Sequence, residues 1–223
     1  MFGVEGGAPW LGAVMTIAGY LVLMLTVERT PGMSRAVKVA IKALPSIGFL
    51  WFAASLEVYR AAWGVWIAAG LVLSAVGDVL LVWPGPKAFV AGLGAFLLGH
   101  VAYAVGFVRH GIAWSAAAGA LVVVGVAAGL FARWILPQVG ERLRGPVIAY
   151  MLVISVMVAG SGGAVAHGAH VGLLVATVLF WLSDVSVAID RFAGGGYFNR
   201  VWGLAFYYAA QLGLAYLAST PAP

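Results

Sequence analysis

Long runs of apolar residues alternate with short polar breaks along almost the whole chain. Breaking the sequence at charged residues, prolines and glycine clusters leaves eight apolar segments, each close to the length of about 20 residues that an α-helix needs to cross a bilayer. The pattern predicts an all-α, polytopic membrane protein in which eight transmembrane helices form one bundle, with residues 1–223 as a single transmembrane domain. The predicted spans are 10–27, 36–54, 62–82, 87–108, 113–135, 146–163, 168–189 and 198–218.

The composition agrees with a bilayer environment. Of the 223 residues, 64% are hydrophobic and 9% are charged, whereas about 25% of the residues of a soluble domain are charged. The chain contains no cysteine, which excludes disulfides and thiolate metal sites. The apolar run from Trp10 is too long for the core of a signal peptide, so we expect it to be a retained span.

The net charge of +5 comes from 12 Lys and Arg against 7 Asp and Glu. Because these cations lie in short connections between spans, they indicate membrane topology rather than a nucleic acid partner. The second and fourth connections contain only Arg60 and Arg109, so we expect the cation-rich odd connections in the cytoplasm and both termini outside. The membrane would be the cell membrane, the inner one in a bacterium. The odd connections contain Arg29, Arg35, Lys38, Lys87, Arg133, Arg142, Arg144, Arg191 and Arg200.

Two carboxylates interrupt the apolar spans, Asp78 in the third and Asp184 in the seventh. A charged residue inside a bilayer costs about 2.5–3.5 kcal/mol on insertion scales and usually marks a functional site. In the predicted topology both carboxylates lie in the cytoplasmic half of the membrane, as do Lys42 in span two and Tyr150 in span six. Four polar groups from four spans therefore share one leaflet.

Two interpretations of the carboxylates remain open. In the functional one, burial lets Asp78 and Asp184 hold a proton near neutral pH, and two carboxyls in contact share one proton and supply an acid and a base. In the structural one, each is only a hydrogen-bond partner, or Asp78 forms an ion pair with Lys42. Ser74 lies one turn before Asp78 on the same helix face, and Ser183 directly precedes Asp184.

Other polar side chains in the spans also allow two interpretations. His100 and Tyr103 are three residues apart and face one side of span four; His100 is either a proton shuttle or substrate ligand, or a neutral packing histidine. Lys42 is either a counter-ion or phosphate anchor, or a side chain that extends to the surface. Span eight contains two tyrosines and an amide near its middle, Tyr207, Tyr208 and Gln211. These side chains either line a pocket or lie at the interface between membrane and water.

Several familiar kinds of active site are missing from the sequence. It has no Gly-x-Ser-x-Gly elbow and no His-Glu-x-x-His pair, which disfavours serine or zinc hydrolysis. His167 and His170 have no third ligand nearby, so we interpret them as loop residues and expect no metal site. The functions that remain possible are acid and base catalysis by two aspartates and proton coupling.

A faint internal repeat relates the two carboxylates. Asp78 and Asp184 are 106 residues apart, and each follows a small residue, precedes valine and falls in the third span of a four-span half. Duplication predicts two four-helix halves of the same orientation. Chance similarity between apolar segments is the alternative.

Five blocks in this order resemble the YhhN family of lysoplasmalogenases: 73–81 (LSAVGDVLL), 96–103 (FLLGHVAY), 144–150 (RGPVIAY), 180–184 (FWLSD) and 207–211 (YYAAQ). The resemblance implies an eight-helix membrane enzyme that hydrolyses the vinyl ether bond of lysoplasmalogens to a fatty aldehyde and glycerophosphoethanolamine or glycerophosphocholine. A bulky Trp181 in place of a smaller residue implies a narrower pocket.

The family's chemistry suits the residues, because vinyl ethers hydrolyse under acid and need neither a metal nor another cofactor. One aspartate would donate a proton and the other would stabilise the cation and activate water. The partners implied are a lysophospholipid substrate and membrane lipid. The candidate catalytic residues are Asp78 and Asp184, and the candidate substrate-binding residues are Lys42, Ser74, His100, Tyr103, Tyr150, Ser183, Tyr207, Tyr208 and Gln211.

A different class of function also fits a repeated bundle with buried carboxylates. A proton-coupled secondary transporter of a small amphipathic or lipid-like substrate would use Asp78 and Asp184 as proton sites, with its two halves rocking about them. The sequence lacks matching spans that are broken by glycine or proline near their middle, a feature typical of such transporters.

Overall fold

The computed structural model describes residues 8–26, 30 and 32–220, and these form eight α-helices and no strand. The prediction of an all-α bundle of eight helices is confirmed. Seven helices are long and apolar enough to cross a membrane, and α3 is shorter, with 17 residues. The helices are α1 (Pro9–Thr26), α2 (Arg35–Ser55), α3 (Gly64–Leu80), α4 (Pro86–His110), α5 (Trp114–Ile135), α6 (Glu141–Ala166), α7 (Gly172–Phe192) and α8 (Gly196–Ser219).

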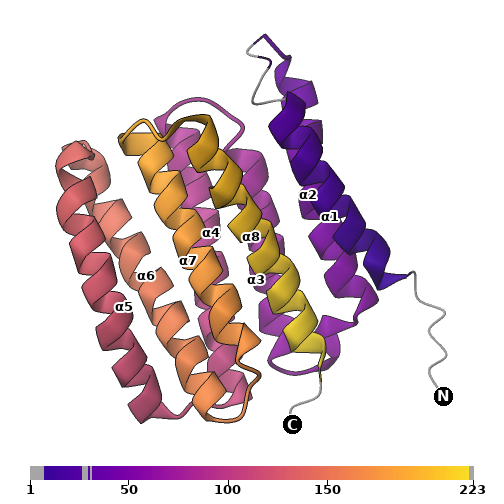
Figure 1. Ribbon diagram of the computed structural model, residues 1–223, viewed down its shortest axis with the longest axis vertical. Coiled ribbons are helices and arrows are strands. Elements are labelled where there is room, and N and C mark those ends of the chain that lie inside the picture. Colours follow the sequence, from indigo (N-terminus) through magenta and orange to yellow (C-terminus); the bar gives the residue numbers. More distant parts are fainter. Residues whose placement is uncertain (1–7, 27–29, 31, 221–223) are drawn as a thin grey trace.

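Successive helices run in opposite directions, so the bundle has two distinct ends (Figure 1). One end, shown at the top, is formed by the last turns of α1, α3, α5 and α7 and the first turns of the helices that follow them. We call it the odd-loop end. The start of α1 and the end of α8 both lie at the opposite end (Figure 1), so the two termini share one side of the bundle, and the outside location predicted for them stays a prediction. Arg29 and the last residue of the first predicted span lie outside the described residues.

The helix packing follows an order that repeats after four helices. Helix α2 packs against α3 and α8, and in the same way α6 packs against α7 and α4. With the α3–α4 and α7–α8 pairs, these contacts close a ring of six helices, while α1 packs outside α2 and α5 outside α6 (Figure 1). The order is the one expected for two four-helix halves; their duplication stays a prediction.

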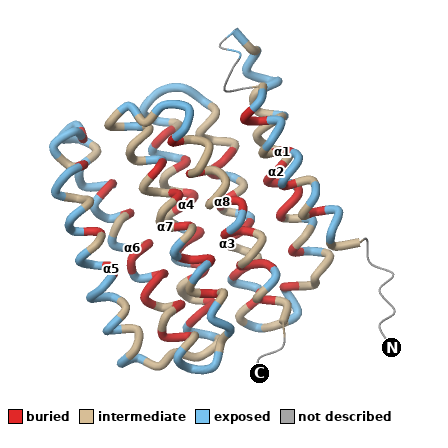
Figure 2. Tube along the Cα trace, viewed as in Figure 1, coloured by how far each residue is buried: buried red, intermediate tan, exposed pale blue. Residues whose placement is uncertain are grey.

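Buried residues lie on the inner faces of the helices and exposed residues on the outer faces (Figure 2), and many of the exposed residues are large and apolar. On α5, Val122, Val123 and Leu130 are each at least two-thirds exposed. So large an apolar surface is unstable in water and stable against lipid tails, where helices also satisfy their own backbone hydrogen bonds. The protein is a multi-pass integral membrane protein.

Two helices begin more than two residues away from the start of their predicted spans. Helix α6 begins at Glu141 rather than at residue 146, because its charged first turn extends beyond the apolar segment and the helix continues through Pro146. Helix α7 begins at Gly172 rather than at residue 168. There Gly168 adopts φ 114° and the Nδ1 of His170 accepts a hydrogen bond from the backbone N–H of Gly172 at 3.0 Å, so the preceding residues form a turn. His170 therefore has a structural role in this loop.

Close packing between α1 and α2 depends on small residues. A Cβ atom at Gly48 would lie 2.6 Å from the backbone nitrogen and the hydroxyl of Thr16. The same hydroxyl donates to the backbone carbonyls of Gly12 at 2.9 Å and Pro45 at 3.2 Å. Small residues at such contacts let membrane helices approach closely.

Replacing Gly48 by leucine should therefore push α1 away from α2 and lower the thermal unfolding midpoint in detergent. Overpacking of this kind costs about 1–3 kcal/mol. The matched control is Gly125→Leu on α5, because a Cβ at Gly125 meets nothing within 4 Å. Equal midpoints for the two variants would contradict the close packing of α1 on α2.

Candidate active site

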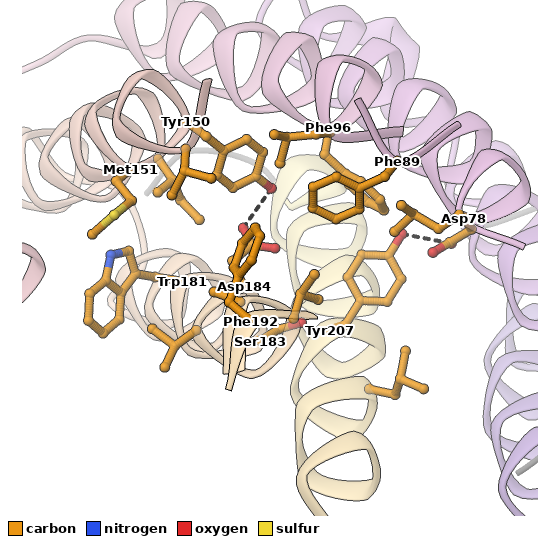
Figure 3. A pocket seen from close by; sticks show the side chains of 18 of the residues that line it. Asp78, Phe89, Phe96, Tyr150, Met151, Trp181, Ser183, Asp184, Phe192 and Tyr207 are labelled. Atoms are coloured by element: carbon orange, nitrogen blue, oxygen red, sulfur yellow. Dashed lines mark hydrogen bonds between the residues drawn. The ribbon is translucent and has the colours of Figure 1, made fainter. Parts of the chain in front are cut away.

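A pocket lies in the half of the ring nearer the odd-loop end. Most of its walls are apolar, as Figure 3 shows, with aromatic rings from α4, α7 and α8. The polar side chains that line it come from α2, α3, α6, α7 and α8, and they are Lys42, Asp78, Tyr150, Ser183, Asp184 and Tyr207.

Asp78 lies in the last turn of α3 and is 5% exposed. Its Oδ2 accepts a hydrogen bond from Ser46 Oγ at 2.6 Å and another from the Tyr207 hydroxyl at 2.8 Å. The preceding Gly77 makes room for a neighbour, because a Cβ there would collide with the ring of Phe96. Helices α2 and α8 thus stabilise a carboxyl group that α3 alone would leave without a partner.

Asp184 lies in the middle of α7, and its side chain is 15% exposed. Its Oδ2 accepts a hydrogen bond from the Tyr150 hydroxyl of α6 at 2.9 Å, and His100 Nε2 of α4 lies 3.4 Å from the same oxygen. The imidazole of His100 is fully buried, and it packs edge-on against the rings of Tyr150 and Phe180.

The partners of the two carboxyls follow the packing repeat of the bundle. Each aspartate contacts one side chain from the preceding helix of its own half: Ser46 of α2 for Asp78, and Tyr150 of α6 for Asp184. Each also has a neighbour from the last helix of the other half: Tyr207 of α8 for Asp78 and, at 3.4 Å, His100 of α4 for Asp184. The geometry is similar in the two halves, but the chemical groups differ, so the two carboxyls have unequal surroundings.

Five of the predicted substrate-binding residues lie behind the pocket wall. Tyr103 of α4 donates to Gln211 Oε1 of α8 at 2.8 Å, and its hydroxyl lies 3.4 Å from Ser74 Oγ of α3. His100 lies beside Asp184, and the ring of Tyr208 packs against Tyr20 of α1 and Tyr207. None of the five lines the pocket. The residues placed in this way are Ser74, His100, Tyr103, Tyr208 and Gln211.

Ser46 is the site residue that the sequence analysis missed. It follows Pro45 and lies four residues after Lys42, so both side chains project from one face of α2. That spacing is the signal that could have found it, because a serine one turn from an intramembrane lysine is well placed to reach the same partner. Its hydroxyl makes the shortest contact to Asp78.

The arrangement is suited to proton transfer in an apolar environment. Two carboxyls line one pocket, each with its own tyrosine hydroxyl, and in Figure 3 they lie on different sides with the ring of Tyr207 between them in this view. Because each carboxyl has a separate donor, one can lose a proton while the other keeps its own. Direct sharing of one proton between them stays a prediction.

Comparison with known proteins gives a consistent set of relatives. The model of the YhhN family matches residues 37–218, a range that includes both carboxyls and all their partners. Lysoplasmalogenase TMEM86B of Mus musculus is 31% identical over 208 residues, which cover 91% of this chain and 83% of the relative. The Homo sapiens protein of the same name is 32% identical over 178 residues, which cover 77% of this chain and 71% of that protein. The lysoplasmalogenase of Mycobacterium tuberculosis is 34% identical over 158 residues, which cover 65% of this chain and 60% of that protein. No solved structure gave a significant match.

The hydrogen bond from Tyr103 of α4 to Gln211 of α8 should stabilise the bundle without contacting the pocket. Tyr103→Phe leaves Gln211 Oε1 buried without its donor, so we expect a loss of about 1 kcal/mol in the free energy of unfolding. A double-mutant cycle with Gln211→Leu, measured by thermal unfolding in micelles, should give a coupling of that size. Tyr216→Phe is the control, because Tyr216 is 55% exposed on the same helix as Gln211. Additive effects of the two core substitutions would contradict this role.

Proposed function

The chain belongs to the YhhN family, and we propose on this basis that it is a lysoplasmalogenase, which hydrolyses the vinyl ether bond of lysoplasmalogens within the membrane. The products are a fatty aldehyde and a glycerophospho-base such as glycerophosphoethanolamine or glycerophosphocholine. One observation carries the proposal beyond family membership: Asp78 and Asp184, from different helices, line a single apolar pocket. An amphipathic lipid suits such a pocket, and the bond to be broken needs acid.

Vinyl ether hydrolysis requires a proton donor, a stabilised cation and water. A carboxylic acid transfers its proton to the β-carbon of the double bond, which leaves an oxocarbenium-like cation at the carbon attached to oxygen. A nearby carboxylate stabilises this cation and accepts a proton from the water that adds to it. The resulting hemiacetal then collapses to the aldehyde and releases the glycerol hydroxyl. Each step uses only proton transfer and water.

The surroundings of the two carboxyls support different roles for them. Asp78 accepts hydrogen bonds from Ser46 and Tyr207 and shares the pocket with the ammonium group of Lys42. Asp184 accepts one from Tyr150. Donors and a nearby cation stabilise a carboxylate, so the ionised form is favoured at Asp78 relative to Asp184. We therefore assign proton donation to Asp184, and cation stabilisation and water activation to Asp78.

Lys42 provides a site for the phosphate of the substrate. It lies in the third turn of α2, near the odd-loop end, and lines the same pocket as Asp78. An ammonium at this depth can reach the headgroup region while its aliphatic stem packs among apolar side chains. The cations around the odd-loop end support a cytoplasmic location for it. The substrate headgroup would then face the cytoplasm.

The packing repeat favours a second candidate, a proton-coupled transporter with two similar halves. The two functions differ in what they need. A hydrolase releases aldehyde in detergent solution, where no gradient exists, whereas a transporter leaves the lipid intact. Release of aldehyde by the purified, solubilised protein therefore distinguishes them.

Replacing either carboxyl should abolish most of the turnover. With a lysoplasmalogen substrate in detergent, Asp184→Asn should lower kcat by about 100-fold or more, because a general acid contributes about 10²–10⁴ in rate. Asp78→Asn should lower it by about 10²–10³, the effect of removing one electrostatic stabiliser. Asp190→Asn is the control on α7, because Asp190 pairs with Arg200 at 2.9 Å and does not line the pocket. Near-normal aldehyde release by either pocket variant would remove that residue from the mechanism.

Lys42→Met should raise KM for the phosphate-bearing substrate, because the ammonium binds the headgroup, and should also lower kcat, because it removes the cation that favours the ionised form of Asp78. The increase should be about tenfold for loss of one charge-assisted contact. Lys38→Met is the matched control, one turn earlier on α2 and outside the pocket lining. If both substitutions change KM equally, general surface charge rather than a phosphate site is responsible.

A further inference from the structure

The pocket extends beyond the centre of the six-helix ring. Its lining includes Asp78 of α3 and also Phe131 of α5. Helix α5 lies outside the ring and packs mainly on α6, and in Figure 1 it forms the left edge of the bundle. A space that reaches both residues must therefore pass between α6 and α7. The pocket has a lateral arm that leads from the two carboxyls to the periphery of the protein.

Four half-buried apolar side chains form the walls of this arm: Phe131 of α5, Met151 of α6, and Trp181 and Val185 of α7. We call them the α6–α7 seam. Figure 3 shows Met151 and Trp181 on one side of Asp184 and Asp78 on the other. No charged group belongs to the seam.

The seam lies directly beside the carboxyl that we assign as the proton donor. Met151 follows Tyr150, whose hydroxyl donates to Asp184, and Trp181 and Val185 lie within one turn of Asp184 on α7. At the opposite side of the pocket, Lys42 is the cation among the lining residues. The pocket is therefore polarised, with an apolar arm at the Asp184 side and a cation at the Asp78 side.

A single-chain ether lysolipid has the same polarity. Keeping each methylene of its hydrocarbon chain out of water stabilises the bound lipid by about 0.8 kcal/mol. The chain therefore stays at bilayer depth, whereas the phosphate binds to a cation. In a vinyl ether the β-carbon belongs to the chain and the ether oxygen joins the chain to glycerol. A chain in the seam therefore places the β-carbon at Asp184 and the glycerol side at Asp78.

We propose that the α6–α7 seam binds the hydrocarbon chain of the lysophospholipid and gives it lateral access from the bilayer, with Val185 and Trp181 limiting the width of chain that fits. The choice of a vinyl ether lipid as occupant rests on the proposed function, while the chain path rests on the shape of the pocket. The path also supports Asp184 as the donor by an argument independent of the hydrogen bonds around it.

A photo-crosslinking experiment tests the chain path without any variant. The probe is a non-cleavable alkyl ether lysophospholipid with a diazirine on the part of its chain nearest the ether oxygen, bound to the full-length protein in lipid nanodiscs. Peptide mapping should locate the crosslinks at the seam, on peptides that contain Phe131, Met151 or Trp181. Crosslinks on α2, α3 or α8 instead would overturn the proposal.

A matched pair of substitutions on α7 tests the same path through turnover. Val185→Trp should fill the seam, while Val175→Trp, at a position 54% exposed and outside the pocket lining, should behave as the parent protein. We expect Val185→Trp to reduce kcat/KM for a long-chain lysoplasmalogen by about tenfold or more, the scale of steric discrimination in apolar pockets. Turnover of a short-chain, water-soluble vinyl ether analogue should fall much less, because fewer of its methylenes must pass through the seam.

The outcomes separate the chain path from the proposed function. Crosslinks at the seam in a parent protein that releases no aldehyde would support the path and refute the hydrolase. Aldehyde release with crosslinks elsewhere, or with equal loss of long-chain and short-chain turnover in Val185→Trp, would refute the path and leave the hydrolase standing.

Discussion

The free energy required to place two carboxyl groups among apolar helices is the constraint on which the structure depends. An unpaired polar group in such surroundings costs several kcal/mol, so each aspartate must receive partners from other helices. Asp78 joins α3 to α2 and α8 through Ser46 and Tyr207. Asp184 joins α7 to α6 through Tyr150 and lies 3.4 Å from the His100 imidazole of α4. The contacts that stabilise the ring of helices are therefore the contacts that surround the two carboxyls.

Because of the same constraint, the two halves of the bundle place their carboxyls at similar positions but surround them with different side chains. At equivalent positions one carboxyl meets a serine and a tyrosine, and the other meets a tyrosine and a histidine. A fully symmetric pair would titrate alike, whereas acid catalysis needs one carboxyl protonated and the other ionised. Unequal partners, together with a cation at one side and an apolar arm at the other, provide that difference. In the proposed mechanism, the orientation of the substrate and the roles of the two acids both follow from this asymmetry.

The sequence predicted the parts of the structure that the bilayer itself dictates. Hydrophobic length located all eight helices, and the rarity of intramembrane charge singled out Asp78 and Asp184. Which side chains meet depends on helix rotation and packing, which hydropathy does not encode. His100 and Tyr103 share a face by spacing, yet one lies beside Asp184 and the other hydrogen-bonds Gln211. Ser46 shares a helix face with Lys42, but that spacing does not show that its hydroxyl reaches Asp78, which depends on how α2 packs against α3.

The proposed mechanism requires an ether lipid to bind with its reactive bond between Asp78 and Asp184. The most direct measurement is an experimental structure of the protein in nanodiscs with a non-cleavable ether lysophospholipid bound. The account predicts density for the ether oxygen between the two carboxyls, the hydrocarbon chain between α6 and α7, and the phosphate near Lys42. A lipid bound outside this pocket, or bound in it with the ether bond beyond hydrogen-bond reach of both carboxyls, would contradict it.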